Sequence, residues 1–171
     1  MTQDEMLDRA LTLHLQKELM VLSIKPPYPD LMMDGKKTIE NRSLKPADCR
    51  IGEPMLIHAS SQRHPAARNL KGYDNACRSA VVGVAHLVDV IRPRQRISEK
   101  LKSKYRLLGV PDLLDGEKDS VYWWIFGNAT AFEKPITCHG KLNLWYPWRV
   151  DGLQAKVTNR LTRLSHVLSF S

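Results

Sequence analysis

The sequence predicts an α+β protein, a small β-barrel with flanking helices and a helical extension at each end. Its 171 residues, 43% hydrophobic and 26% charged, suit one domain of an ordinary globule. Strand-like apolar runs fill the middle of the chain, and helical periodicity is clearest near its two ends. We therefore expect an N-terminal helical extension over 1–19, a central domain over 20–148 and an amphipathic C-terminal helix over 149–171 packed on that domain.

Helices are predicted from capping residues and spacing. Residues 2–17 are predicted to form a helix, because Thr2 and Glu5 at its start have the spacing of a capping box. Residues 30–34 predict a short helix with Asp30 as its cap and Gly35 at its end. Two more helices are expected, one around 66–76 within a polar segment and one from 153 to 168, where apolar residues recur at helical spacing.

Strands are expected over 20–25, 38–43, 55–59, 81–90, 122–126, 131–132 and 141–145. The run 81–90 is apolar on both faces, which is typical of a strand covered on both sides, as in a small barrel with helices outside. Gly127 and Asn128 are interpreted as a turn between two strands. Prolines at 26, 27 and 29 end the first strand, because proline donates no ladder hydrogen bond.

The charge is strongly positive and unevenly distributed. There are 26 basic and 18 acidic residues, a net charge of +8. Seven basic residues lie between 92 and 106 against Glu99 alone, so this segment carries +6, and it is expected to be partly helical. A polyanionic partner is expected, with Arg92, Arg94 and Arg96 contacting phosphates; the alternative is a solvated positive loop.

Several classes of protein are disfavoured. The three cysteines form no C-x-x-C pair, which disfavours a secreted disulfide framework and favours the reducing cytoplasm. No glycine-rich phosphate loop, membrane span or signal peptide is visible, and the six histidines are scattered. We expect no cofactor and no metal site, unless the protein is a nuclease that uses a divalent ion. The oligomeric state is left open.

A family resemblance rests on Gly35, Lys37, Glu40 and Arg42, which match the signature G-x-K-x-x-E-x-R. The run 22–42 closely resembles the opening of an ASCH domain. Runs that resemble its later strands follow in the family's order, so the resemblance covers about 20–145. The family belongs to the PUA-like superfamily of small β-barrels with flanking helices. The resemblance implies that the protein binds RNA or acts on a nucleotide.

The signature residues also have a direct physical interpretation. On a strand, Thr38, Glu40 and Arg42 share one face, Ile39 points into the core, and Lys37 lies at the mouth of the strand. A carboxylate flanked by cations can accept donors from a base edge while the cations receive phosphate. Lys37, Glu40 and Arg42 are therefore expected to open onto one cleft that holds a nucleotide or a base. The alternative is an ordinary ion pair between Glu40 and Arg42 that only positions the strand.

Further candidate residues lie on neighbouring segments. His58 and Ser60 share a strand face and are predicted to line the same cleft, although His58 is equally well explained as a structural histidine. Most aromatic residues are assigned to the core. Tyr28, which follows Lys25 in the proline loop, and Trp124 are predicted to be exposed and to stack on bases. Lys25 is expected to contact the ligand as well.

Two classes of function stay open, with a weaker third. The first is a nucleic-acid-binding module, for RNA rather than DNA. The second is a hydrolase, because some PUA-like relatives are similar to an amidase for acetylated cytidine and others to ribonucleases. Lys37 lies at the amidase lysine position, but Glu40 replaces its threonine; Lys37 would act as base, and Glu40 would activate water or hold a metal ion. The third is a reader of modified DNA bases with an aromatic cage.

Overall fold

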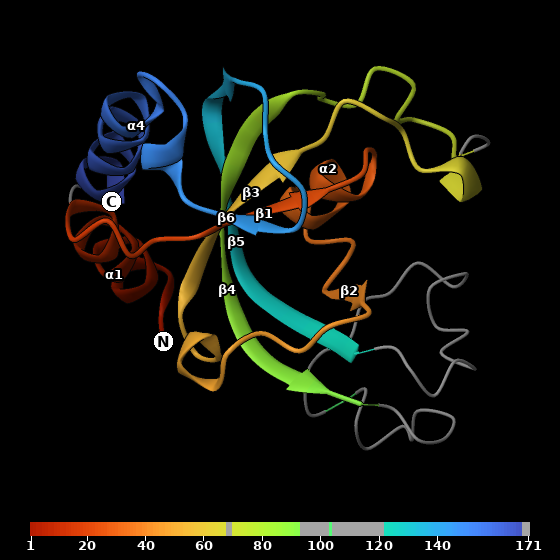
Figure 1. Ribbon diagram of the computed structural model, residues 1–171, viewed down its shortest axis with the longest axis horizontal. Helices are drawn as coiled ribbons and strands as arrows, with labels where there is room; N and C mark the ends of the chain where they lie inside the picture. The colour runs from red at the N-terminus through yellow and green to blue at the C-terminus, as the bar shows by residue number, and fades with distance from the viewer. Residues whose placement is uncertain (68–69, 93–102, 104–121, 169–171) are drawn as a thin grey trace.

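A strongly curved sheet of six strands forms the centre of the computed structural model, which describes residues 1–67, 70–92, 103 and 122–168 (Figure 1). The strand order is β2-β5-β4-β3-β1-β6. Only β1 and β3 run parallel among these neighbours; the other pairs are antiparallel. The strands are β1 (Val21–Ile24), β2 (Ile39–Arg42), β3 (Pro54–Ala59), β4 (Ala80–Ile91), β5 (Tyr122–Thr137) and β6 (Leu144–Trp145).

Helices cover both faces of this sheet. In Figure 1, α1 (Gln3–Leu15) and α4 (Leu153–Leu168) lie together on one side, and α2 (Tyr28–Met33) lies on the other. Each side has its own apolar cluster. Val84 of β4 belongs to the cluster under α1 and α4, whereas Ala85 belongs to the cluster under α2. The predicted α+β fold with flanking helices is therefore confirmed, with the expected small barrel present as a six-stranded half-barrel, and β4 is covered on both faces as predicted.

The two terminal helices pack on each other as well as on the sheet. The predicted capping box is present, because Glu5 donates its backbone N–H to Thr2 Oγ1 at 3.2 Å and Thr2 donates its own to the Glu5 carboxylate at 2.7 Å. Near the end of α1, His14 Nε2 lies 2.9 Å from the backbone oxygen of Gln154. The Gln154 amide donates back to the His14 oxygen at 2.9 Å. The N- and C-terminal helices thus form one layer.

Three predicted elements differ from the structure. The helix α2 begins at Tyr28 after Pro27, so Asp30 is not its cap; the Asp30 carboxylate instead accepts the backbone N–H of Cys77 at 2.8 Å. In place of a helix around 66–76, the described residues form a short 3-10 helix, η2 (Pro65–Ala67), and turns. The chain does not turn at Gly127 and Asn128, because β5 is continuous through both residues.

The pairing of β5 with β4 is irregular at Gly127 and Asn128. The register shifts between Val84 and His86, so that residues of β5 are left without a direct partner at this point. Asn128 adopts a left-handed φ of 47° there. The turn-forming pair of residues in the sequence therefore marks a bulge, and the strand continues because its flanking segments keep their partners.

Candidate functional site

A cleft of about 280 Å³ lies at the open side of the curved sheet. It is bounded by the end of β1 and the proline loop, by β2, by the end of β3, and by the loop that precedes β6. Segments far apart in the sequence thus meet at one place. The residues that line it are Ser23, Lys25, Tyr28, Glu40, Asn41, Arg42, Ser60, His64, Leu142 and Asn143.

Lys37 is brought beneath this cleft by the turn after α2. Gly35 has a φ of 69°, which favours glycine, and the Lys37 N–H then donates to the Leu31 backbone oxygen at 3.1 Å. The Lys37 side chain has no exposed surface. Its Nζ donates to the Ile39 backbone oxygen and lies 5.2 Å from the centroid of the Tyr28 ring.

The expectation that Lys37 opens onto the cleft is therefore wrong. Its Nζ lies 3.1 Å from Oε2 of Glu40, and Glu40 is the residue that faces the cleft. Burial lowers the pKa of the Lys37 ammonium; the Glu40 carboxylate opposes this effect and the Arg42 guanidinium adds to it. Lys37 is thus placed to act on a ligand through Glu40.

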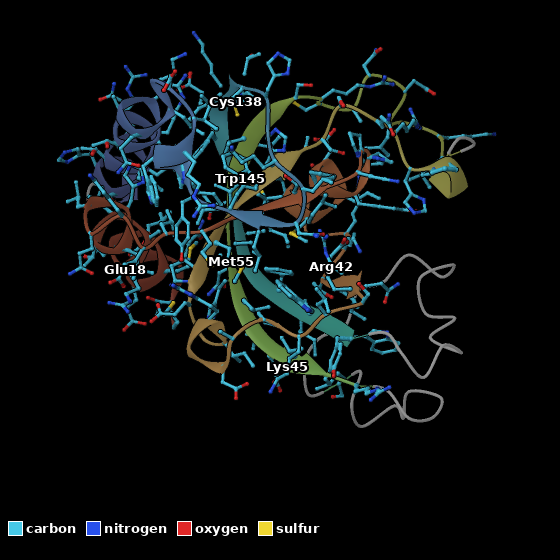
Figure 2. The ribbon with its side chains drawn as sticks, viewed as in Figure 1. Glu18, Arg42, Lys45, Met55, Cys138 and Trp145 are labelled. Carbon is cyan, nitrogen blue, oxygen red and sulfur yellow. The ribbon has the colours of Figure 1, made fainter. Side chains whose placement is uncertain are left out.

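Arg42 connects the two sides of the curved sheet. Its Nη2 donates to the Ser23 backbone oxygen at 2.5 Å and lies 3.4 Å from Oε1 of Glu40. Its Nη1 lies 3.5 Å from Oδ1 of Asn143 in the loop before β6. Figure 2 shows Arg42 beside β2. Glu40 and Arg42 therefore present a carboxylate and a guanidinium side by side in one cleft.

His58 on β3 and Ser60 directly after β3 lie at different positions relative to the cleft. Ser60 lines the cleft as predicted. His58 is 2% exposed and lies behind the cleft wall: its Nδ1 is 3.1 Å from Ser23 Oγ, and its ring meets Trp145 edge-on at 5.6 Å. Burial lowers the pKa of the His58 imidazole. The structural interpretation of His58 therefore fits its surroundings.

The prediction that Tyr28 and Trp124 are exposed is wrong. Trp124 is 3% exposed, pairs with Glu40 in the register of β2 and β5, and donates its indole N–H to the Leu44 oxygen at 3.1 Å. Tyr28 is 5% exposed, although its ring forms part of the cleft wall. The large rings are used to fill the half-barrel, and Trp148 is the tryptophan that stays 45% exposed. The cleft lining contains no aromatic cage, since Tyr28 and His64 are its only rings among the residues described.

His64 is a cleft residue that the sequence analysis missed. Its ring centroid lies 5.1 Å from that of Tyr28 at an interplanar angle of 54°. Burial lowers the pKa of the His64 imidazole, and Lys25 lowers it further while Glu40 opposes the change. No sequence signal distinguishes this histidine, because it lies in an irregular polar segment. Ser23, Asn41, Leu142 and Asn143 were missed as well, although they lie in runs that were predicted as strands, because the strand pattern does not show which segments border a cleft.

Of the remaining predicted residues, one lines the cleft, one lies apart from it, and two lie outside the described residues. Lys25 is exposed and lines the cleft. Arg92 lies just after β4, with its guanidinium 5.7 Å from the centroid of the Tyr122 ring, and does not line the cleft. Arg94 and Arg96, with most of the basic segment 92–106, lie outside the described residues.

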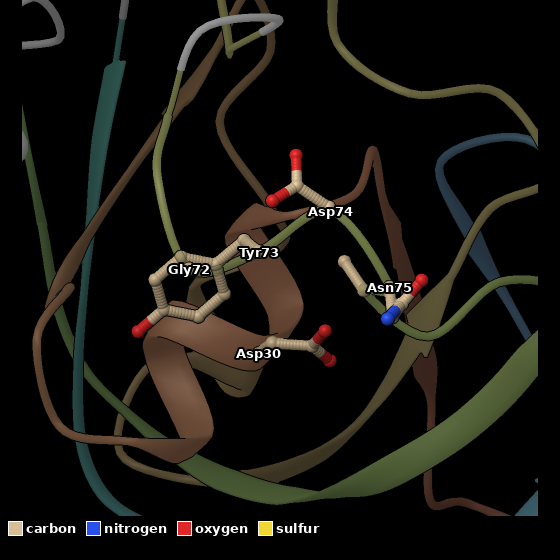
Figure 3. A pocket seen from close by; sticks show the side chains of 6 residues that line it. Asp30, Gly72, Tyr73, Asp74 and Asn75 are labelled. Atoms are coloured by element: carbon tan, nitrogen blue, oxygen red, sulfur yellow. The ribbon is translucent and has the colours of Figure 1, made fainter.

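A second cavity, of about 340 Å³, lies beside α2 (Figure 3). It is lined by Asp30, Gly72, Tyr73, Asp74, Asn75 and Ala76. Burial raises the pKa of the Asp30 carboxyl, while the bond from Cys77 opposes this shift. Two carboxyl groups and no basic side chain line this cavity, so its charge is opposite to what a phosphate requires. The first cleft is the candidate site.

Two kinds of feature are absent from the residues that the structure describes. No group of three or more histidine, cysteine, aspartate or glutamate residues could hold a metal ion there. No helix in that part of the chain has the length and apolar character needed to cross a membrane.

Comparison with known proteins identifies the family. The family model described as the ASCH domain matches residues 22–136. The chain belongs to the ASCH family. The match runs from β1 almost to the end of β5, so the ASCH signature lies inside it and the terminal helices lie outside it. It ends at residue 136, whereas the resemblance seen in the sequence extends to about 145.

Solved ASCH structures have the same fold. The crystal structure of ASCH from Zymomonas mobilis is 16% identical, with a TM-score of 0.50, over 82% of this chain and 92% of that chain. A serine-to-alanine variant of the Zymomonas mobilis protein is 16% identical, with a TM-score of 0.51, over 85% of this chain and 96% of that chain. At this identity the likeness concerns the fold alone. A search of curated proteins finds no match.

Proposed function

We propose that this ASCH protein binds nucleic acid, RNA rather than DNA, and holds a nucleotide or an unstacked base in the cleft. The observation that carries the proposal is the position of Glu40 and Arg42, whose charged groups lie 3.4 Å apart and line the same cleft. The cleft volume of about 280 Å³ is just below the usual ~300–1,000 Å³ for small-molecule sites, which suits one base with part of its sugar.

The other cleft residues match the remaining parts of a nucleotide. Lys25 and Arg42 can neutralise a phosphate, with Arg42 donating more than one hydrogen bond. The Tyr28 and His64 rings and the exposed Leu142 offer surface for a base. Single-stranded RNA is the favoured partner because its loops and ends supply unstacked bases, which duplex DNA does not.

The basic segment 92–106 would add contacts outside the cleft. It carries +6 of the net charge of +8, so it can attract phosphates without reading sequence. Arg92, the first residue of this segment, directly follows β4. In this proposal the cleft supplies the specificity, and the segment supplies the affinity that depends on salt.

Binding to labelled oligonucleotides tests the proposal. Fluorescence anisotropy would be measured with single-stranded RNA and with duplex DNA of the same sequence, between about 50 and 300 mM salt. We expect tighter binding of RNA, and a log affinity that falls with log salt by about 0.7 for each phosphate neutralised. Glu40→Ala should change the preference between bases. Absence of binding to any oligonucleotide, or binding that is insensitive to salt, would contradict the proposal.

A hydrolase is the second candidate, favoured by the desolvated amine of Lys37 in contact with Glu40. Burial lowers the pKa of the Lys37 ammonium, and Glu40 joins this group to the cleft. For an amide substrate, water would lose a proton to Glu40 and attack the amide carbon; the C–N bond would break and the proton would pass to the leaving nitrogen. Lys37, which is buried on the core side of Glu40, would hold the Glu40 carboxylate in position.

Two assays separate the enzyme from the binding module. The protein would be incubated with acetylated cytidine and with labelled RNA, each with and without Mg²⁺ or Mn²⁺. Turnover that Glu40→Gln and Lys37→Ala both abolish would establish the hydrolase. Binding without turnover in either assay would leave the binding module as the function.

A further inference from the structure

The carboxylate of Glu40 faces the cleft with its position set from two sides. Lys37 Nζ lies 3.1 Å from Oε2 on the core side, and Arg42 Nη2 lies 3.4 Å from Oε1 along the strand. An ionised carboxylate accepts hydrogen bonds and donates none, and its two oxygens have about four lone-pair positions. One such position on each oxygen is therefore left for a ligand. The carboxylate offers two adjacent acceptors to whatever enters.

Only one of the four RNA bases meets two adjacent acceptors with two adjacent donors. The pairing edge of guanine carries the N1–H and the 2-amino group next to each other. Adenine and cytosine place a ring nitrogen acceptor beside their amino group, so a lone pair would face a carboxylate oxygen. Uracil has its single N–H between two carbonyl oxygens, which the carboxylate would also repel. Glu40 thus discriminates by repulsion as well as by attraction.

Arg42 supplies the third group that a guanine edge requires. The O6 acceptor of guanine lies directly beside N1–H, just as the Arg42 guanidinium lies beside Oε1 of Glu40. Arg42 Nη2 is used by Ser23 and Glu40, and Nη1 is 3.5 Å from Asn143. Each terminal nitrogen has two hydrogens, so one on Nη1 is left to donate to O6.

We infer that the cleft selects guanine, with Glu40 accepting from N1–H and the 2-amino group and Arg42 donating to O6. The inference rests on the proposed function, because it concerns the same cleft. Tyr28 and His64 would bound the base on one side. Lys25 would then be left for the phosphate. The specificity is set by the order of acceptors and donors along β2, in which Glu40 precedes Arg42 by two residues on one face.

The test compares single-stranded RNAs that differ at one position. Five labelled uridine-rich oligonucleotides would carry guanine, inosine, adenine, cytosine or uracil at the centre. Inosine keeps N1–H and O6 but lacks the 2-amino group, so it removes one of the two donors. We expect guanine to bind best, inosine about fivefold weaker, and the other three about tenfold or more weaker.

A substitution at the carboxylate provides the second measurement. Glu40→Gln keeps the size of the side chain but replaces one acceptor by a donor, so the preference for guanine should fall to less than about threefold. Glu133→Gln, at an exposed carboxylate on β5 outside the cleft, removes the same charge and serves as the matched control. Ratios between oligonucleotides are unaffected by an inactive fraction, and circular dichroism would check folding.

The outcomes distinguish this inference from the proposed function. Equal binding of all five oligonucleotides, with normal salt dependence, overturns guanine selection and leaves nucleic-acid binding in place. A preference for another base, or a guanine preference that survives Glu40→Gln, also overturns it. Absence of binding to any of the five contradicts the proposed function itself.

Discussion

Arg42 on β2 donates from Nη2 to the backbone oxygen of Ser23 on β1 at 2.5 Å, although β5, β4 and β3 lie between these two strands in the sheet. This hydrogen bond spans the opening of the curved sheet and links its two sides, because β2 and β1 are not neighbours in the strand order. The guanidinium therefore shapes the cleft as well as charging it.

Replacing Arg42 by lysine should separate its charge from its geometry. Lysine keeps the positive charge but lacks the planar fork that reaches Ser23 and Glu40 together. We expect Arg42→Lys to weaken oligonucleotide binding about tenfold, with the salt dependence unchanged. Arg42→Ala should also reduce the slope of log affinity against log salt by about 0.7. Full affinity in the lysine variant would show that charge alone suffices.

Lys37→Met should lower the stability of the fold although it keeps the volume of the side chain. It removes the donor to the Ile39 oxygen and one of the two cations beside Glu40. Loss of one partner of a buried pair costs about 3–5 kcal/mol, and we expect about 2 kcal/mol because Glu40 keeps Arg42. Urea denaturation would measure the loss. An unchanged midpoint would mean that this pair contributes little.

Gly140→Ala should disturb the loop that forms one wall of the cleft. A Cβ atom at this position would overlap the imidazole ring of His58, so either the loop or the buried ring must move. We expect a loss of about 1–3 kcal/mol in the free energy of unfolding, with weaker ligand binding. In the control Gly127→Ala, the nearest atom is the end of the Val88 side chain at 3.2 Å, and both properties should change less.

The contact of His14 on α1 with Gln154 on α4 should make the stability of the fold depend on pH. Burial lowers the pKa of the His14 imidazole below its ordinary value of 6.5, and the Gln154 backbone opposes this. At pH values between the pKa of His14 in the folded protein and its pKa in the unfolded chain, the unfolded chain binds more protons than the folded protein. The contribution of His14 to the free energy of unfolding is therefore fully present above about pH 6.5 and decreases as the pH is lowered. Nδ1 of His14 lacks a hydrogen-bond partner among the described residues, so a proton there would be unsatisfied.

Denaturation curves between pH 5 and pH 8 would measure this effect. His14→Gln removes the titrating group and should make the decline toward pH 5 smaller than in the wild type. His58, His64 and His86 keep part of the decline, because burial lowers their pKa values as well. Parallel curves for the variant and the wild type would exclude His14 as a contributor.

Neutralising the basic segment should weaken binding without changing base preference. The double variant Arg94→Gln and Arg96→Gln removes two cations that we expect to contact phosphates. The slope of log affinity against log salt should then fall by about 1.4, equally for all sequences. A selective loss for one sequence would mean that these residues read bases instead.

Much of the fold follows from local patterns that tertiary contacts reinforce. The capping box of α1, the two-sided burial of β4 and the tight turn at Gly35 were all predicted, because each depends on residues close together in the chain. The bulge in β5 was mistaken for a turn. Glycine and asparagine favour left-handed backbone in both settings, and only the pairing with β4 decides between them.

The amino-acid sequence by itself determined that Lys37, Glu40 and Arg42 follow a glycine turn onto one short strand. Alternation along a strand sets the face on which a residue lies, so Glu40 and Arg42 were correctly placed together. Only the tertiary structure decided that Lys37 is buried beneath Glu40 and that His64 and Asn143 join the cleft. The physical reason is that periodicity reports the direction of a side chain, whereas its burial depends on which distant segments the curved sheet brings over it.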